Sequence, residues 1–164
     1  MQIGTIVMYN GQLCKIKEAV ERSFFPGQPA KLYYTLSPVE REEDALYVPA
    51  EQATEKCRPI LSKAEIELMR HKADAQTLPW IEDRIQRAKE YGQILKDGDP
   101  AQILLLIRCL LEKKKQLAVS KKKLTATDEK LLSAAEKMID DEFAYVLNMN
   151  REELAEFFEL KSNM

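Results

Sequence analysis

Residues 46–65 read LYVPAEQATEKCRPILSKAE, and at this stretch the composition of the chain changes. Five of the seven prolines and three of the five glycines lie in the first 59 of the 164 residues. The residues that follow hold only two of each and carry apolar side chains at helical spacing. Proline and glycine favour turns and interrupt helices. The sequence therefore predicts an α+β protein of two domains, a β-rich domain at residues 1–59 and an all-α domain at residues 60–164.

Short strands separated by tight turns are expected in the first domain. Residues Ile3–Tyr9 and Gln12–Val20 flank Asn10-Gly11, a pair typical of a two-residue hairpin turn because both residues accept positive φ. Lys31–Ser37 and Ala45–Val48 are rich in aromatic and β-branched residues and predict two more strands. Four or more short strands with tight connections favour a small antiparallel SH3-like sheet. The edges of such a sheet are open to an additional strand.

About five helices are expected in the second domain, and most of them begin at a local capping signal. The expected spans are residues 64–72 after a Ser62/Glu65 capping box, 77–97 with Thr77 as cap and Gly98 as stop, 100–122 after Asp99-Pro100, a fourth helix capped by Thr125 or Thr127, and a short one after Asn150 with Glu153. The segment Ile103–Ile107 is apolar almost all round and is expected to be buried.

The sequence offers little support for catalysis. His71 is the only histidine and lies in a polar helix end, and the five glycines are too scattered for a phosphate-binding loop. The three cysteines, Cys14, Cys57 and Cys109, lack metal-ligand spacing and indicate reduced thiols. There is no signal-peptide pattern and no apolar run of the roughly 20 residues that span a bilayer. We therefore expect a cytoplasmic protein that is not an enzyme, binds no metal or cofactor and does not contact a membrane.

Charge is distributed unevenly in the helical domain. Residues 108–123 hold seven basic side chains against one acid, and residues 128–159 hold ten acids against three basic side chains. Such blocks usually form solvated helix faces that pair with each other. The alternative is that the basic helix faces a polyanion.

The expected second helix carries two stripes. At about 100° per residue, Ile81, Ile85, Ala88 and Leu95 form a predicted core face. Trp80, Arg84, Arg87 and Tyr91 form a second stripe from which carboxylates are excluded. This second stripe suits a nucleic-acid backbone, with guanidinium groups on phosphates and an aromatic ring that stacks or wedges. The other interpretation is that Trp80 and Tyr91 pack on a neighbouring helix while the arginines pair with the acidic last helices.

The chain resembles the CarD/CdnL-type bacterial transcription regulators over about residues 3–158. The resemblance is carried by the order and spacing of six segments: IGTIVMYNG (3–11), KLYYTLSPV (31–39), YVPAEQA (47–53), RPILSKAE (58–65), DGDP (97–100) and TDEKLLSAAEKMIDDEFAYVL (127–147).

The resemblance implies two partners. A Tudor-like β domain would dock by strand pairing on a lobe of the RNA polymerase β subunit, for which the expected contact residues are Arg22, Tyr34, Leu46, Tyr47 and Val48. The helical domain would contact promoter DNA without sequence specificity, through the minor groove and backbone at the upstream edge of the transcription bubble. The expected DNA-binding residues are Trp80, Arg84, Arg87, Tyr91, Lys121, Lys122 and Lys123. The family needs no catalytic group for this role, and we expect a monomer.

Two alternatives stay open. In the family a wedge tryptophan is followed closely by consecutive arginines, whereas here Ile81-Glu82-Asp83 separates Trp80 from Arg84. Alignment from the Gly98-Asp99 stop places Arg84, rather than Trp80, at the wedge position. The second alternative concerns function: the protein would be a polymerase-docking adaptor whose helical domain binds another protein instead of DNA.

Overall fold

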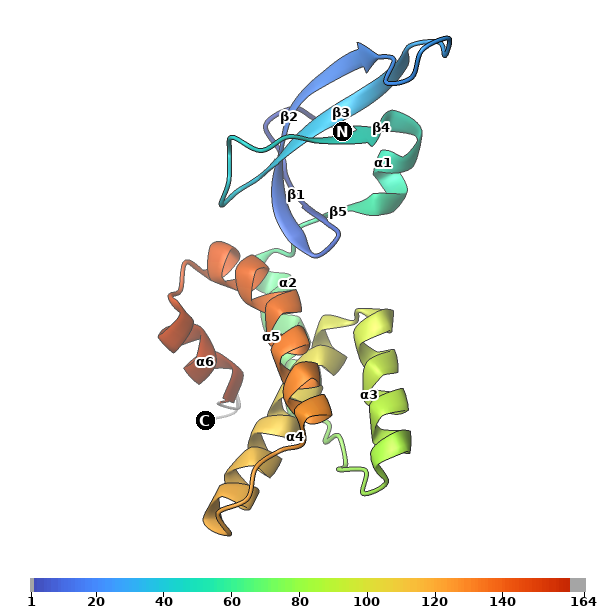
Figure 1. Cartoon of the computed structure of the whole chain (residues 1–164). Coiled ribbons are helices and arrows are strands. Elements are labelled where there is room, and N and C mark those ends of the chain that lie inside the picture. Colours follow the sequence, from blue (N-terminus) through green and yellow to red (C-terminus); the bar gives the residue numbers. More distant parts are fainter. Residues whose placement is uncertain (1, 160–164) are drawn as a thin grey trace. The chain divides into compact units, whose positions relative to one another are not determined.

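The computed structural model describes residues 2–159 and divides into two compact units, one running to Ile60 and the other starting at Leu61 (Figure 1). The first unit is a five-stranded antiparallel sheet with one short helix, and the described part of the second unit is helical. The predicted α+β class, with the β part first, is confirmed.

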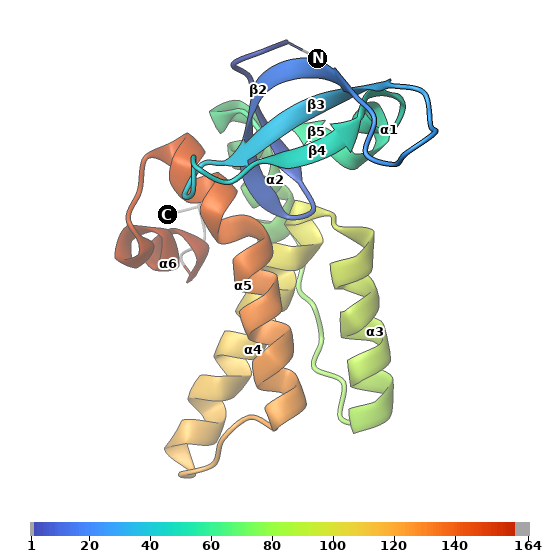
Figure 2. The same cartoon turned by 45° about the horizontal axis from the view of Figure 1, so that its top comes forward.

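The sheet has the order β4-β3-β2-β1-β5. Its strands are β1 (Ile6–Tyr9), β2 (Gln12–Arg22), β3 (Lys31–Pro38), β4 (Leu46–Pro49) and β5 (Cys57–Pro59), and α1 (Ala50–Lys56) follows β4 (Figure 2). The predicted β1–β2 hairpin is confirmed, since Asn10 and Gly11 have φ values of 48° and 77° and Tyr9 pairs with Gln12. The order places β4 at one edge of the sheet and β5 at the other.

A small apolar core fills the first unit. Its buried members come from every strand and from α1: Val7, Cys14, Ile16, Leu36, Val48, Ala53 and Cys57. Burial raises the pKa of the Cys14 thiol, and the nearby Cys57 adds to the shift. Burial also raises the pKa of Cys57. Both cysteines are free thiols, as the sequence predicts.

The second unit contains α2 (Lys63–Asp74), α3 (Arg84–Asp97), α4 (Pro100–Val119), α5 (Ala126–Leu147) and α6 (Arg151–Glu159). Local capping signals determine most of their starts. The Ser62/Glu65 capping box is present, Thr125 caps α5, and the Asn150 side chain accepts from the Glu153 amide at 2.8 Å. Among these helices, none is both long and apolar enough to cross a membrane.

The centre of α4 is the hydrophobic core of this unit. Ile103, Leu104, Leu105, Leu106 and Ile107 are all at most 4% exposed, which confirms the predicted burial of this segment. Figures 1 and 2 both show α4 running beside α5, and α5 contributes Leu132, Ala135, Ile139 and Phe143 to the same core. The predicted end of α4 near residue 122 was wrong, since the helix ends at Val119.

The predicted helix over residues 77–97 was wrong at its start. The helix α3 begins at Arg84, where the Asp83 carboxylate accepts from the Gln86 amide at 2.9 Å. Trp80 therefore lies on an irregular segment before the helix. The predicted core face was wrong at Ile85, which is 82% exposed, whereas Ile81 and Leu95 do pack against the core. Arg87 and Tyr91, which the pattern placed on the other stripe, are buried. The physical reason is that α3 uses two polar side chains, each with long-range partners, to attach to the rest of the unit.

Candidate functional site

The candidate nucleic-acid site of the helical unit is built around the Arg87 guanidinium. This side chain lies on α3, is 5% exposed, and forms a two-pronged ion pair with Asp128 in the first turn of α5. Arg87 Nε donates to Asp128 Oδ1 at 2.9 Å, and Nη2 donates to Oδ2 at 2.8 Å. A guanidinium and a carboxylate match each other in this geometry, which makes the pair both strong and directional.

The remaining donors of Arg87 hold the irregular segment. Nη1 donates to the carbonyl oxygens of Ile81 at 2.9 Å and Glu82 at 3.2 Å. These carbonyls precede α3 and would otherwise need partners from a longer helix or from water. The arginine thereby replaces the helical hydrogen bonds that the sequence pattern leads one to expect.

Asp128 is ionised at neutral pH. Burial raises the pKa of this carboxyl, but hydrogen bonds from Arg87 and Thr125 outweigh burial and bring the pKa below its ordinary value of 3.8. The Thr125 hydroxyl donates to Asp128 Oδ2 at 2.8 Å, and the Asp128 amide donates back to Thr125 Oγ1 at 3.1 Å. The carboxylate is thus part of the α5 cap as well as the partner of Arg87.

Tyr91 also holds this irregular segment through hydrogen bonds. Its ring is fully buried, its hydroxyl donates to the Pro79 carbonyl at 2.9 Å, and it accepts from the Ile81 amide at 3.3 Å. Burial raises the pKa of Tyr91 well above its ordinary range, so the hydroxyl remains a donor. Prediction of Arg87 and Tyr91 as surface contacts to DNA was wrong, because both side chains are in the interior.

Trp80 is half-buried and contacts two cationic side chains. The Arg87 guanidinium lies over its ring at 4.3 Å and the Lys113 ammonium at 5.2 Å from the ring centroid. The Tyr91 ring meets it edge-on at 6.3 Å. Cations over an indole ring are attracted by its quadrupole, so Trp80 has cationic contacts and still keeps part of its surface in solvent.

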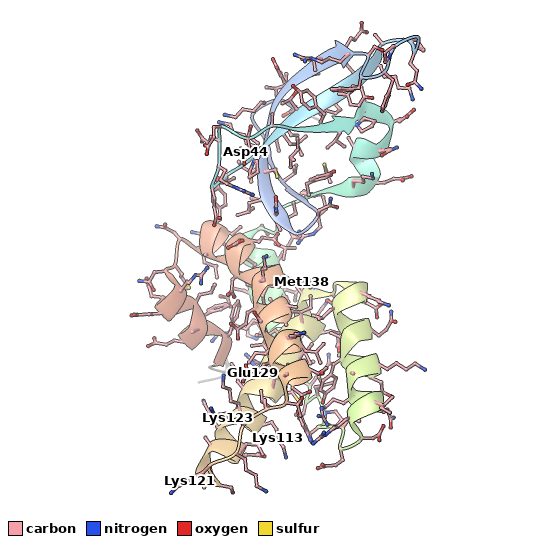
Figure 3. All side chains as sticks on the ribbon, in the orientation of Figure 1. Asp44, Lys113, Lys121, Lys123, Glu129 and Met138 are labelled. Atoms are coloured by element: carbon pink, nitrogen blue, oxygen red, sulfur yellow. The ribbon has the colours of Figure 1, made fainter. Side chains whose placement is uncertain are left out.

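The turn after α4 adds an exposed basic surface. Lys121, Lys122 and Lys123 are exposed and line a shallow hollow together with Lys114, Leu124 and the acidic Glu129. Figure 3 shows Lys121 and Lys123 at this end of the unit, with Lys113 further back along α4. Lys113 contacts Trp80, and its neighbour in the sequence, Lys114, lines the hollow. Arg84 is exposed in the first turn of α3.

Two of these residues were not identified as site residues from the sequence. Lys113 was placed in a basic run without a link to Trp80, and Asp128 was placed in an acidic block. No local signal connects Arg87 with Asp128, which is 41 residues away. The second interpretation of the stripe, in which the arginines pair with the acidic last helices, is confirmed for Arg87, but only the packing of α3 against α5 reveals that its partner is Asp128.

In the β unit, the five expected docking residues separate into two groups. Val48 is 1% exposed and belongs to the core, and Tyr34 and Leu46 pack against that core. The Val48 side chain is therefore not available to a partner, contrary to the prediction. Tyr47 and Arg22 are exposed and lie close together, with the guanidinium 5.5 Å from the ring centroid.

Tyr47 belongs to an aromatic cluster beside the β4 edge. Phe24, in the turn between β2 and β3, contacts Tyr33 at 4.9 Å and Tyr47 at 5.2 Å between ring centroids. The turn is closed by Ser23, whose hydroxyl lies within hydrogen-bond distance of the carbonyls of Phe25 and Gln28. Phe24 and Tyr47 remain 45% and 39% exposed. An edge strand with adjacent exposed aromatic rings offers both backbone pairing and apolar contact.

Asp140 on α5 is a second titratable group of interest. It lines a hollow with Glu136, Arg151 and apolar side chains from α4 and α6. Burial, followed by repulsion from Glu136, raises its pKa from 3.8 to about 6, although Arg151 opposes the shift. The folded chain therefore holds this proton more tightly than the unfolded chain.

This shift predicts how stability depends on pH. Because the native pKa is raised, the unit should gain stability as pH falls from about 6 to about 4. Asp140→Asn removes the charge penalty, so it should raise Tm at pH 7 and change it little at pH 4. Thermal melts of the variant and of the exposed control Glu156→Gln at both pH values test this. A similar rise for Asp140→Asn at pH 4 and pH 7 would contradict the assignment.

Comparison with protein families identifies the helical unit. The family model described as "CarD, C-terminal domain" matches residues 65–159, which is more than half of the chain. The chain belongs to the CarD family. CarD-family proteins are transcription factors and are associated with RNA polymerase interaction. No curated protein matches the chain.

The CarD match covers the helical unit from α2 to α6. It therefore includes Trp80, the Arg87–Asp128 pair and Lys121–Lys123 in the turn after α4. The match supports a role in transcription for the chain. Among the described residues, no group of three His, Cys, Asp or Glu side chains is arranged to hold a metal ion.

Proposed function

We propose that the chain is a bacterial transcription regulator that docks on the RNA polymerase β subunit and contacts promoter DNA at the upstream edge of the bubble. The carrying observation is that the CarD match contains both a half-buried tryptophan in contact with two cationic side chains and the exposed lysines Lys121–Lys123. The β unit would bind the polymerase, and the helical unit would modulate the stability of the open complex. Such a protein acts as a monomer in the cytoplasm, where bacterial transcription takes place.

The DNA contact rests on the chemistry of the exposed groups. Phosphate contacts are made mainly by lysine and arginine and carry no sequence information. Arg84 and Lys121–Lys123 are exposed cations suited to that role. An apolar ring that enters a base step at a fork offsets part of the unstacking cost. Trp80 is the residue proposed for that contact, and Arg84 is the alternative.

The polymerase contact rests on the β4 edge. An edge strand has backbone groups that a partner strand can pair with. We propose that Leu46, Tyr47 and Val48 pair through their backbone, while the side chains of Tyr47 and Arg22 supply contacts. Tyr34 supports the strand from within the sheet, since it pairs with Val48.

The adaptor alternative keeps the polymerase contact and replaces DNA by a protein. Burial of Arg87 and Tyr91 favours it, because two of the expected DNA residues are then absent from the surface. The two functions differ in their dependence on salt, since phosphate contacts release counterions and most protein contacts do not.

The salt dependence of DNA binding gives a direct test. Replacing Lys121, Lys122 and Lys123 by alanine should weaken binding to forked promoter DNA. It should also lower the slope of log K against log salt by roughly 0.7–0.9 for each phosphate that the variant no longer neutralises. The measurement is fluorescence anisotropy of labelled forked DNA over a range of salt concentrations.

A matched control removes the same charge elsewhere. Lys63, Lys72 and Lys96 are exposed lysines on α2 and α3, and their replacement by alanine should leave most of the slope in place. Equal slopes for the two triple variants would remove Lys121–Lys123 from the DNA site. A wild-type slope near zero would favour the adaptor.

Docking on the polymerase is tested separately. Tyr47→Ala should weaken binding to an isolated β-subunit lobe by roughly tenfold, the effect typical of an aromatic residue central to an interface. Tyr145→Ala is the control, because Tyr145 is a similarly exposed tyrosine (48%) on α5. Surface-immobilised lobe and full-length variants give the affinities. A lobe affinity unaffected by Tyr47→Ala would remove this side chain from the docking surface.

A further inference from the structure

The backbone around Trp80 is held by side chains rather than by secondary structure. Trp80 is the only tryptophan in the chain and lies four residues before Arg84, the first residue of α3. The carbonyls of Pro79, Ile81 and Glu82 accept from Tyr91 or Arg87 at 2.9–3.2 Å. The position of the Trp80 backbone is therefore set by these two buried side chains.

The orientation of the ring depends on the same arginine. The Arg87 guanidinium is planar, lies 4.3 Å from the ring centroid, and is fixed in its own plane by the two-pronged contact with Asp128. A lysine at this position would supply charge but neither the planar stacking surface nor the fork. The Asp128 carboxylate bonds to the guanidinium and to Thr125, so its effect on Trp80 passes through Arg87.

We propose that the Arg87–Asp128 ion pair is a positioning device that holds the Trp80 ring in the orientation in which it meets nucleic acid. The purpose of the device rests on the proposed function, but the contacts themselves exist without DNA. A ring that is ordered before binding loses less side-chain freedom when it binds, which increases affinity. Arg87 and Asp128 are thus positioning residues, and neither touches DNA.

The sole tryptophan gives a direct readout of ring order. In the full-length chain without DNA, Asp128→Asn should increase acrylamide quenching of Trp80 fluorescence and speed its anisotropy decay. Glu129→Gln is the matched control, because it removes the same charge from the next residue of α5. Glu129 forms an exposed pair with Lys114 at 3.3 Å instead of a contact with Arg87. This control should keep the wild-type fluorescence.

A second variant separates positioning from stability. Replacing a buried ion pair with apolar residues of similar volume often leaves a protein as stable as before. The double variant Arg87→Met with Asp128→Leu should therefore fold, as shown by circular dichroism and a thermal melt, yet release the ring. If the ion pair serves only stability, the folded double variant should show wild-type acrylamide quenching of Trp80. If the pair positions the ring, quenching should increase.

Affinity for forked DNA completes the test. At one fixed salt concentration, the double variant should bind forked DNA roughly two- to tenfold more weakly, the usual cost of ordering one side chain on binding. Wild-type quenching and wild-type anisotropy decay in both variants would overturn the proposal, whatever the DNA result. If Trp80→Ala binds forked DNA as well as wild type, the DNA contact fails while the fluorescence result still decides whether the pair orders the ring.

Discussion

Replacing Asp128 with alanine should destabilise the helical unit by about 3–5 kcal/mol, because it leaves a buried arginine without its counter-charge. Arg87 is 4% exposed and makes two hydrogen bonds to this carboxylate. The α5 cap also loses its bond from the Thr125 hydroxyl. In a unit of this size the loss should lower Tm by more than about 10 °C.

Glu129→Ala is the control for this loss. Both acids lie in the first turn of α5, so both variants lose the same favourable interaction with the helix dipole. Glu129 is half exposed and forms its ion pair with the similarly exposed Lys114, and such surface pairs contribute about 0–1 kcal/mol. Thermal and urea unfolding of both variants at pH 7 give the difference. Equal losses of stability would mean that the buried pair is no stronger than the surface pair.

The pH dependence of the same pair has a defined sign. The native pKa of Asp128 is lowered, so its contribution is fully present above the ordinary value of 3.8 and is lost as pH falls below it. Asp140 acts in the opposite direction, since its raised pKa favours the folded state as pH falls from about 6. The difference in Tm between wild type and Asp128→Ala should accordingly shrink in acid.

Replacing Trp80 with alanine should weaken binding to forked promoter DNA roughly 5- to 150-fold, because contact between one base and an aromatic ring contributes about 1–3 kcal/mol. Binding to the isolated β-subunit lobe should be unchanged. Affinities for a forked and a fully paired duplex of the same sequence show whether the loss is specific to the fork.

Two controls accompany this prediction. Trp80→Phe keeps an apolar ring and should retain part of the affinity. A thermal melt shows whether the loss of the ring over Arg87 has destabilised the unit, since the two groups are stacked. If wild type and Trp80→Ala bind forked DNA equally well, Trp80 is not the wedge, and Arg84→Ala then tests the alternative position.

The elements that were predicted well are those with local signals. The Ser62/Glu65 box and the Asn150/Glu153 cap depend on side chains within three residues of the backbone that they bind. The Asn10-Gly11 hairpin turn depends on two neighbouring residues that accept positive φ. Gly98 ends α3 with a φ of 75°, a conformation that few other residues accept. The apolar run Ile103–Ile107 could be placed in the core because five consecutive apolar residues cover every side of a helix. Exposing them to water would cost free energy.

The candidate site was predicted less well because its polar residues are buried. A pattern of helical periodicity assigns apolar residues to the interior and arginines to the surface. Here Arg87 and Tyr91 are inside and Ile85 is outside. The periodicity failed because a buried guanidinium is stable only with a partner, and its partner Asp128 is distant in the sequence.

By itself, the sequence determined the change from sheet to helix across residues 46–65, most helix starts and the resemblance to CarD proteins. These follow from interactions between near neighbours and from the order of short segments, both of which can be recognised in the sequence. Only the tertiary structure decided which residues of α3 are buried and which side chains contact the Trp80 ring. Both depend on long-range packing, above all on the ion pair between Arg87 and Asp128, which the packing of α3 on α5 brings together. A contact between residues 41 positions apart has no local signature, because its energy arises only when burial removes both charges from water.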